Sequence, residues 1–337
     1  MPTLKFLHYT DVHIQENNPP SRLGDYKSDV FGKMRQIMAL ARTHKVDFTV
    51  CGGDLFNAKK PAATKHSTVT SIAGILNKVD VPHYLVPGNH DLTGDSMDTI
   101  PDQPIGVLLE TGVMKQITNQ VVTKKDLKVQ MFSFPFDEEP DLSEYASNPE
   151  EGVDVSILGI HVYASPRGGT LYGKTKVFSY PELSKTKHDV YLLGHYHADN
   201  GAITDDFGEA KPQTFVNVGS VTRGDYGDEN LARVPKVCLV TITKNSEGVV
   251  TVTTEEIELK VRSNAETFDL ERKSKLKEQK QQTEEFVTQL LETSEAVDVK
   301  ETISEQLAVL ATEKEIFDLT MDFITRAHEE LGKVMKK

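Results

Sequence analysis

The chain has few cysteines, and their placement restricts what they can do. Cys51 and Cys238 are the only two, and they lie far apart, each inside an apolar run. A disulfide framework or a zinc knuckle needs more cysteines at closer spacing. We therefore predict two buried thiols that pack in the core as small apolar side chains.

The sequence also lacks an apolar run long enough to cross a bilayer. Its first residues, MPTLKFLHYTDVH, lack the basic start, the long apolar stretch and the small-residue cleavage site of a secretory signal. The short apolar run there is typical of a first strand. We expect a protein without a membrane segment that works in the cytoplasm, which would be the host's cytoplasm if a phage encodes the chain.

Basic residues are too few to balance the acidic ones, and the net charge is −13. This deficit argues against a protein that coats nucleic acid through general positive charge. It does not exclude a nucleic-acid enzyme, because bound divalent cations would add positive charge at the site itself. The acidic excess is concentrated in 137–151, which is typical of a solvated loop, and in the C-terminal part of the chain.

Residues 1–260 alternate between short β-branched runs and helix-like segments, a pattern that predicts layered α/β structure with much antiparallel sheet. Apolar spacing predicts helices at about 27–44 and 62–79. Two long stretches, 121–135 and 236–259, should each fold as a hairpin. The expected strands are 4–10, 47–51, 82–87, 121–135, 153–161, 189–194, 214–218 and 236–259.

The composition changes after about residue 260. Residues 265–337 contain no proline and a single glycine, and their apolar residues recur at helical spacing. We predict a catalytic domain at 1–260 and a helical segment at 261–337, interrupted near 294–299. The amphipathic pattern fits either a cap packed on its own catalytic domain or a docking element for a partner.

Five predicted strands run into residues that can bind a metal ion. In layered α/β folds the carboxyl ends of strands meet at one edge, where ligands gather. Five of the eleven histidines belong to this set, and glycine stands beside most of these strand ends. The candidate residues are Asp11, His13, Asp54, Asn89, His90, His161, His195 and His197.

Each candidate has an ordinary structural explanation when it is taken alone. A histidine after an apolar strand is more often a satisfied structural histidine than a ligand, and Asp54 could be a turn residue after Gly52-Gly53. The Asn89-His90-Asp91 segment could be a loop with local side-chain bonds. These explanations fail jointly, because nitrogen and oxygen ligands recur in one positional context.

The ligand types indicate the metals and the chemistry. Histidine, aspartate and asparagine without cysteine favour first-row metals such as Mn, Fe, Zn or Ni. The set is too large for one metal with an open position and suits two, which can clamp both oxygens of a phosphoryl displacement. Two divalent ions bring about +4 and Asp11 with Asp54 return about −2, so the site can hold a phosphodiester anion.

The motifs, in this order, resemble those of the calcineurin-like metallophosphoesterase superfamily, over roughly residues 1–235. They are DVH at 11–13, GGD at 52–54, GNHD at 88–91, GIH at 159–161 and GHYH at 194–197. The resemblance implies an α/β fold, a layered αββα metallophosphoesterase sandwich, here with a C-terminal helical segment.

Further details are similar to the SbcD-type DNA repair nucleases of bacteria and phages. The protein phosphatases of the superfamily favour DxHG and GDxxDRG, whereas Ile14 follows DVH and LFNAKK follows GGD here. The SbcD-like details are His8 ahead of DVH, GGDLF at 52–56, Arg22 and Asp25 after the first strand, and VGSVTRG at 218–224.

Carried over residue by residue, the resemblance assigns roles. It implies that His90 is not a ligand but protonates the leaving 3′ oxygen or stabilises the transition state, and that Asp91 orients it. We expect two divalent ions, Mn²⁺ first, with Fe, Zn, Ni or Mg as alternatives. The implied ligands are Asp11, His13, Asp54 and His197 for the first metal and Asp54, Asn89, His161 and His195 for the second.

The resemblance also implies a substrate and partners. They are DNA, an SbcC-like ABC-type coiled-coil ATPase bound by the C-terminal helices, and a second copy of the chain near 62–79, although a core-facing helix there is a comparable reading. Among the basic residues, Arg167 and Arg223 are the better candidates for phosphate contact. Most of the others, which are Lys59, Lys60, Lys65 and Arg233, are interpreted as ordinary solvated surface.

Three functions compete. The first is a two-metal-dependent DNA nuclease, a 3′–5′ exonuclease and single-strand endonuclease, in an SbcCD-like repair or recombination complex. The second is a small-nucleotide phosphodiesterase or a phosphoprotein phosphatase of the same superfamily. The third is a scaffold without chemistry, against which the complete ligand set argues. The GGDLF motif and the C-terminal helices favour the first.

Overall fold

The structure is a computed structural model that describes residues 1–57, 59–137, 140–171 and 173–293, with side chains through residue 285. The chain divides into two compact units, Met1–Phe268 and Asp269–Lys337, and each is described by itself. The predicted domain boundary at residue 260 stays a prediction. The predicted break near 294–299 and the apolar positions beyond it lie outside the described residues.

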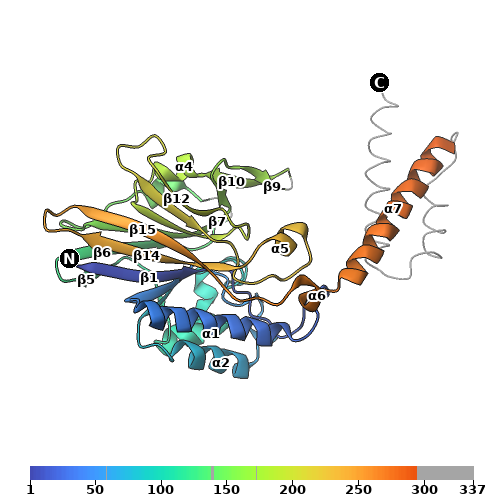
Figure 1. Ribbon diagram of the computed structural model, residues 1–337, viewed down its shortest axis with the longest axis horizontal. Helices are drawn as coiled ribbons and strands as arrows, with labels where there is room; N and C mark the ends of the chain where they lie inside the picture. Colours follow the sequence, from blue (N-terminus) through green and yellow to red (C-terminus); the bar gives the residue numbers. More distant parts are fainter. Residues whose placement is uncertain (58, 138–139, 172, 294–337) are drawn as a thin grey trace. The chain divides into compact units, whose positions relative to one another are not determined.

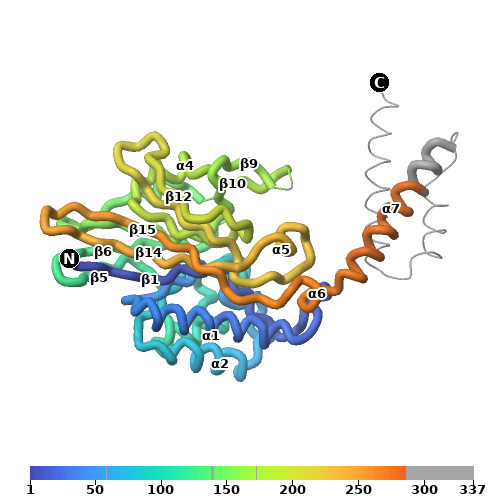
Figure 2. The backbone as a smooth tube through the Cα atoms, in the orientation of Figure 1, coloured from blue at the N-terminus to red at the C-terminus, as the bar shows by residue number. Residues whose placement is uncertain are grey.

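A six-stranded sheet in the order β15-β14-β1-β2-β3-β4 forms one half of the first unit. The strands β1 to β4 are parallel, and the hairpin of β14 and β15 joins β1 antiparallel, although it comes more than 200 residues later in the sequence (Figure 2). The strands are β1 (Thr3–Tyr9), β2 (Phe48–Cys51), β3 (His83–Leu85), β4 (Lys115–Gln116), β14 (Lys236–Lys244) and β15 (Val250–Glu258).

A second six-stranded sheet has the order β12-β13-β11-β7-β6-β5, with four parallel inner strands and an antiparallel strand at each edge. A small sheet of three short strands follows β7. The strands are β5 (Gln120–Lys124), β6 (Leu127–Phe134), β7 (Val155–Val162), β11 (Val190–His195), β12 (Gly201–Asp205), β13 (Gln213–Asn217), β8 (Ala164–Ser165), β9 (Gly169–Leu171) and β10 (Thr175–Ser179).

Helix α1 (Tyr26–His44) shows why these segments begin and end where they do. The side chain of Asp25 caps its first turn by accepting a hydrogen bond from the Ser28 amide at 3.0 Å. Lys45, at φ 52, ends the helix in the left-handed conformation. The other helices of the first unit are α2 (His66–Leu76), α3 (Pro104–Glu110), α4 (Tyr180–Ser184), α5 (Asp228–Ala232) and α6 (Asn264–Thr267), with 3₁₀ turns at Pro61–Ala63, Met97–Asp102 and Leu142–Tyr145.

Three apolar clusters separate four layers of the first unit, which are helices, sheet, sheet and helices (Figure 1). The first cluster lies between the first sheet and α1 to α3, the second between the two sheets, and the third between the second sheet and α4. Along β1, Leu4 and Phe6 face the second sheet, whereas Leu7 and Tyr9 face the helices. The predicted αββα sandwich is confirmed, and its outer helical layer on the second sheet is thin.

The second unit contributes one described helix, α7 (Leu270–Thr293), within the stretch where helix was predicted. In the part of the chain that the structure describes, no helix is long and apolar enough to cross a membrane. Cys51 and Cys238 are both free and buried, as predicted.

The predicted hairpins form, and the prediction for 62–79 is too long. Helix α2 spans only His66–Leu76, because Lys65 ahead of it is extended and Pro61–Ala63 forms a separate 3₁₀ turn. Apolar spacing extended the prediction across this turn, since Ala62 and Ala63 do not interrupt a helical pattern.

Candidate metal centre

The strand ends that carry the predicted ligands meet where the two sheets face each other. Asp11, Asp54 and Asn89 follow β1, β2 and β3 of the first sheet, whereas His161 lies in β7 and His195 ends β11 of the second sheet. Nδ1 of His161 donates to the Gly52 carbonyl at 2.7 Å, and the His195 amide lies 3.2 Å from both oxygens of the Asp11 carboxylate. These contacts join the two sheets at the site.

The loops after β1 and β2 run side by side beyond the ends of their strands. The Asp11 amide donates to the Gly53 carbonyl at 3.0 Å, and the His13 amide donates to the Asp54 carbonyl at 2.9 Å. A third bond joins the amide of Ile14 to the next carbonyl along, at 3.0 Å. This pairing holds the two carboxylates on neighbouring loops at a fixed separation.

The backbone at these residues is strained. Asp11, His13, Asp54 and His195 have φ values of 53°, 50°, 52° and 80°, in a region that non-glycine residues avoid. They are four of the nine non-glycine residues with positive φ in the described ranges. Such strain costs on the order of 1–3 kcal/mol per residue and gathers at functional sites.

One group of potential ligands contains Asp11, His13 and His197. Nε2 of His197 lies 2.9 Å from Nε2 of His13 and 3.5 Å from Oδ1 of Asp11. Their ligand atoms all lie within 4.8 Å of one another, a spacing that suits donors around one cation. Three of the four residues expected at the first metal are thereby brought together.

A second group contains Asp54, His161 and His195, three of the four residues expected at the second metal. Nε2 of His161 lies 3.4 Å from Oδ2 of Asp54. Oδ2 of Asp54 also lies 3.7 Å from Nε2 of His13, so the same carboxylate faces both groups. That is the position a bridging ligand needs.

Two buried atoms at this place lack the partners that buried polar atoms normally have. Nε2 of His161 and Oδ1 of Asn89 make no hydrogen bond with the described residues. Because Nδ1 of His161 donates to the Gly52 carbonyl, Nε2 is the ring nitrogen that faces Asp54. The donor set and its unsatisfied atoms therefore fit a pair of divalent metal ions.

The pKa values of the carboxyl groups agree with a ligand cluster. Burial opposes the ionisation of Asp11, but the hydrogen bond and the charge of His197 outweigh it and hold the pKa of Asp11 well below its usual range. Burial is likewise outweighed by His161 at Asp54, whose pKa is also lowered. Both carboxylates are ionised, as metal ligands must be.

The pKa values of the histidines at the site are shifted in opposite directions. Burial lowers the pKa of His195 to about 3, with a further contribution from the charge of His161. Burial also lowers the pKa of His13 to about 4, against the charge of Asp54. At His161 the charge of Asp54 outweighs burial and raises the pKa to about 9, and a metal ion would take the place of that proton.

His90 lies at the edge of both groups. Its amide donates to Oδ1 of Asp54 at 2.8 Å, and its Nδ1 donates to the Asn57 carbonyl at 2.6 Å. His90 also forms a third potential ligand group with His13 and Asp54. The Asn57 side chain lies 3.1 Å from Nδ1 of His13, so one asparagine orients two histidines. Sequence reasoning missed Asn57, although it stands directly after GGDLF.

Asp91 has a different set of contacts from the one expected. Its buried carboxylate accepts hydrogen bonds from the amides of Asp54, Gly88 and Leu55 at 2.8, 3.0 and 3.1 Å. Burial raises its pKa to about 7, and the charge of Asp54 adds to that rise. Asp91 ties the GNHD loop to the GGDLF loop, and its predicted role in orienting His90 stays without a supporting contact among the described residues.

No described contact places either of the two arginines predicted to bind phosphate at the metal centre. Arg167 is exposed in the loop after β8. Arg223 donates to Oδ1 of Asn264 at 2.6 Å and to the Arg262 carbonyl at 3.1 Å. Neither arginine has a described contact with a predicted ligand, so their phosphate role stays a prediction.

Arg233 was expected on the solvated surface, and that expectation is wrong, because it is only 9% exposed. Its guanidinium donates to the carbonyls of Ser220 and Thr222. The Ser220 hydroxyl donates in turn to the Asp11 carbonyl at 2.7 Å. Arg233 therefore fixes the VGSVTRG loop against Asp11, a contact that local sequence pattern does not reveal.

Three half-buried aromatic side chains flank the second group. The ring of His195 lies 3.9 Å from that of Tyr163 and 5.1 Å from that of Phe136, between centroids. Tyr196 lies 6.1 Å from Tyr163. We call Phe136, Tyr163 and Tyr196 the aromatic shelf. Rings of this kind beside a phosphate site suit the stacking of a nucleobase.

Comparison with known proteins gives a match over most of the first unit. A family model described as Calcineurin-like phosphoesterase matches residues 4–199. The matched range contains every predicted ligand, from Asp11 to His197.

Two archaeal relatives match a shorter stretch, and both are named DNA double-strand break repair protein Mre11. The protein of Archaeoglobus fulgidus is 32% identical over 93 residues, which are 27% of this chain and 20% of that protein. The protein of Saccharolobus solfataricus is 26% identical over 88 residues, which are 26% of this chain and 23% of that protein. Less than a quarter of either relative is therefore matched.

Two solved structures resemble the chain at low identity. A dimetal phosphatase of Danio rerio has a TM-score of 0.46 and 12% identity, and covers 77% of this chain and 100% of that one. A 5′-nucleotidase of Candida albicans has a TM-score of 0.46 and 14% identity, and covers 76% of this chain and 52% of that one. Similarity at this level does not indicate a substrate.

Proposed function

Because the chain belongs to the calcineurin-like phosphoesterase family, we propose that it is a two-metal-dependent nuclease that hydrolyses phosphodiester bonds of DNA. The observation that carries the proposal is the pair of ligand groups that the Asp54 carboxylate faces, at 3.7 Å from Nε2 of His13 and 3.4 Å from Nε2 of His161. Family membership implies a metal-dependent phosphoester hydrolase, and the finer assignment to DNA is ours. The proposed activities are a 3′–5′ exonuclease and a single-strand endonuclease.

The residues of the metal centre have different proposed roles. Two divalent ions would supply positive charge for the attacking water and for the phosphate oxygens. We assign Mn²⁺ to both positions, because mixed nitrogen and oxygen ligands suit it, with Fe, Zn, Ni or Mg as alternatives. The first ion would be held by Asp11, His13, Asp54 and His197, and the second by Asp54, Asn89, His161 and His195.

His90 is the proposed proton donor. In phosphodiester hydrolysis a water oxygen bonds to phosphorus, the bond from phosphorus to the 3′ oxygen breaks, and that oxygen takes up a proton. Since the Asn57 carbonyl accepts from Nδ1 of His90, the proton that the leaving oxygen takes up would come from Nε2 of the doubly protonated ring. The Asn57 contact would also keep the ring in one orientation during the reaction.

Two observations support DNA over a phosphoprotein. The relatives with a partial sequence match are named for DNA double-strand break repair. The aromatic shelf lies directly beside His195, where a nucleobase attached to the scissile phosphate can stack. The shelf equally favours a second candidate, a small-nucleotide phosphodiesterase, since its substrate carries the same bases.

The proposal extends to partners and location. We propose an SbcC-like ATPase bound through 261–337, a homodimer through the exposed side of α2, and action in the cytoplasm. The buried face of α2, with Val69, Ile72 and Leu76, is used by the core, so only its other face is open to a second copy.

A comparison of substrates tests the proposal. The Mn²⁺-loaded protein would be given end-labelled single- and double-stranded DNA, a chromogenic small diester, a cyclic dinucleotide and a phosphopeptide. We expect cleavage of DNA and of the small diester, with nucleoside 5′-monophosphates as products. Hydrolysis of the cyclic dinucleotide without DNA cleavage would favour the second candidate, and hydrolysis of the phosphopeptide alone would overturn the nuclease assignment.

A further inference from the structure

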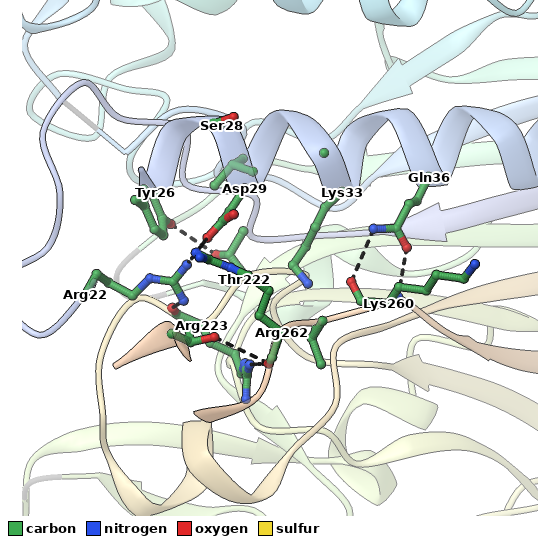
Figure 3. A pocket seen from close by; sticks show the side chains of 14 residues that line it. Arg22, Tyr26, Ser28, Asp29, Lys33, Gln36, Thr222, Arg223, Lys260 and Arg262 are labelled. Carbon is green, nitrogen blue, oxygen red and sulfur yellow. Dashed lines mark hydrogen bonds and ion pairs between the residues drawn. The ribbon is translucent and has the colours of Figure 1, made fainter. Parts of the chain in front are cut away.

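A pocket lies apart from the metal centre, between helix α1, residues 222–223 and the segment 260–267 (Figure 3). Its volume is about 320 Å³, near the lower end of the range for small-molecule sites. Gln36 closes one end through two hydrogen bonds to the backbone of Lys260, at 2.8 and 3.2 Å.

The lining is strongly cationic, in a chain whose net charge is −13. Asp29 supplies the one carboxylate among the lining residues. That carboxylate is already bound by Arg22 at 2.7 Å and by Arg262. Positive charge therefore exceeds negative charge inside the pocket. The cationic lining residues are Arg22, Lys33, Arg223, Lys260 and Arg262.

Lys33 is the residue that the fold leaves unexplained. Its side chain extends from α1 into the pocket (Figure 3), and its ammonium is buried without a hydrogen-bond partner among the described residues. Burial, followed by the charges of Arg223, Arg233 and Arg22, lowers the pKa of Lys33 to about 7, against the opposing charge of Asp29. Without a partner this ammonium gives up part of its charge, whereas an anion bound beside it would hold the proton on Lys33.

A purely structural reading accounts for the arginines but not for Lys33. Arg22 stacks on Tyr26 and Phe268 and donates to the Arg223 carbonyl, so it fastens the segment that ends at Phe268 to the rest of the unit. Arg223 and Arg262 also contact that segment or α1. Lys33 has no hydrogen-bond partner in the described ranges, and an apolar residue would suffice at this position if its only task were to fill space.

We propose that this pocket is a second anion site, which binds a phosphate group with Lys33 as its central ligand. Guanidinium and ammonium groups that converge from three chain segments are the chemistry that recognises phosphate. The phosphate has two potential sources, a free phosphate or mononucleotide and the backbone of a polynucleotide. The inference goes beyond the proposed hydrolysis, since no ligand of the metal centre lines this pocket.

One side chain, that of Tyr26, connects the pocket with the loop that carries His13. The Tyr26 hydroxyl lies 3.2 Å from the His13 carbonyl and 3.3 Å from Oγ1 of Thr222, while its ring lines the pocket. A phosphate bound beside Lys33 is thus separated from the loop that carries His13 by Tyr26. The two sites are distinct, so a substitution at Lys33 leaves the metal ligands in place.

The test uses Lys33→Met in the full-length, metal-loaded protein, because methionine keeps the length of the side chain and removes the charge. Arg35→Met is the matched control, at an exposed position of the same helix outside the pocket. Arg262→Gln is a second pocket variant, at a partly exposed residue. Hydrolysis of a chromogenic small diester without added phosphate should be unchanged in all three, which shows that the fold and the metal centre are intact.

Binding is measured with two probes at constant ionic strength, inorganic phosphate and a phosphorothioate single-stranded oligonucleotide. We expect Lys33→Met to lose about tenfold or more in affinity for at least one probe and Arg262→Gln to lose less, with Arg35→Met unchanged. Since the metal centre is common to every variant, the difference between Lys33→Met and Arg35→Met measures the pocket.

Each outcome of these binding measurements either supports the phosphate site or overturns it. Loss confined to phosphate identifies a free phosphate or mononucleotide as the source, and loss confined to the oligonucleotide identifies a polynucleotide. Equal losses in Lys33→Met and Arg35→Met would show a general charge effect and overturn the site. Unchanged affinity of Lys33→Met and Arg262→Gln for both probes would overturn it as well.

Discussion

At the metal centre, the backbone of Gly53 packs directly against the imidazole of His161. Gly53 has φ +114°, and a Cβ at this residue would lie 2.2 Å from Nδ1 of His161. No side chain can be accommodated without moving the imidazole or the loop. The position of His161, a ligand proposed for the second metal, therefore depends on the absence of a Cβ atom at Gly53, in a loop of the other sheet.

We predict that Gly53→Ala displaces His161 and lowers metal affinity and hydrolysis of a small diester by about 10–100-fold. Metal content by mass spectrometry and the rate on the diester are the measurements. Gly74→Ala in α2 is the matched control, because a Cβ there meets nothing within 4 Å. The control should bind metal normally and be more stable by about 0.5–1 kcal/mol.

His90→Ala tests the division between ligands and proton donor. We expect the variant to keep its metal and to lose about 10²–10⁴-fold of its DNA cleavage, because the leaving oxygen is no longer protonated. Metal content and single-turnover cleavage are measured on the same preparation. A loss of one metal equivalent would instead assign His90 to the ligands, as its group with His13 and Asp54 allows.

At the scale of elements, the carboxyl ends of strands determine the site. The strands that end before Asp11, Asp54 and Asn89, and the strand that ends at His195, are predicted by β-branched runs. Their ends converge because parallel strands point the same way. The aromatic shelf and the contacts of Arg233 could not be predicted from the sequence, since they join residues far apart in it. Phe136 follows β6, whereas Tyr163 and Tyr196 follow β7 and β11.

The loop at 218–224 gives a prediction of its own. Arg233→Lys keeps the charge but loses the planar fork that bonds two carbonyls at once. We expect affinity for the first metal, bound through Asp11, to fall about tenfold while the second metal is held normally. Stepwise metal titration distinguishes the two. Equal weakening of both metals, or no weakening, would contradict the positioning role.

At the scale of the whole molecule, stability should depend on pH through His188. This histidine is 1% exposed, its Nε2 lies 2.8 Å from the Tyr145 carbonyl, and burial lowers its pKa to about 4. The unfolded chain binds the proton near its ordinary pKa of about 6.5. The folded state therefore has its full stability, as far as His188 determines it, above pH 6.5. The free energy of unfolding falls as the pH falls from 6.5 to about 4, because the unfolded chain binds a proton that the folded chain excludes.

The expected loss is about 3 kcal/mol over that interval. It is measured as the free energy of urea unfolding at a series of pH values, in the wild type and in His188→Gln. The variant should show a flatter profile between pH 6.5 and 4, whereas the exposed control His66→Gln should follow the wild type. Parallel profiles for His188→Gln and the wild type would exclude His188 as the source.

The pairing of β1 with β14 has a consequence for synthesis. Residues 3–8 need 238–243 as antiparallel neighbours, and the loop that supports Asp11 comes from 218–222. A growing chain that has produced all of its ligands, through His197, still has an open edge along β1 and an unsupported Asp11. The ribosome must deliver some 45 further residues before the metal centre has its final surroundings, so early metal uptake by a nascent chain would meet an incomplete site.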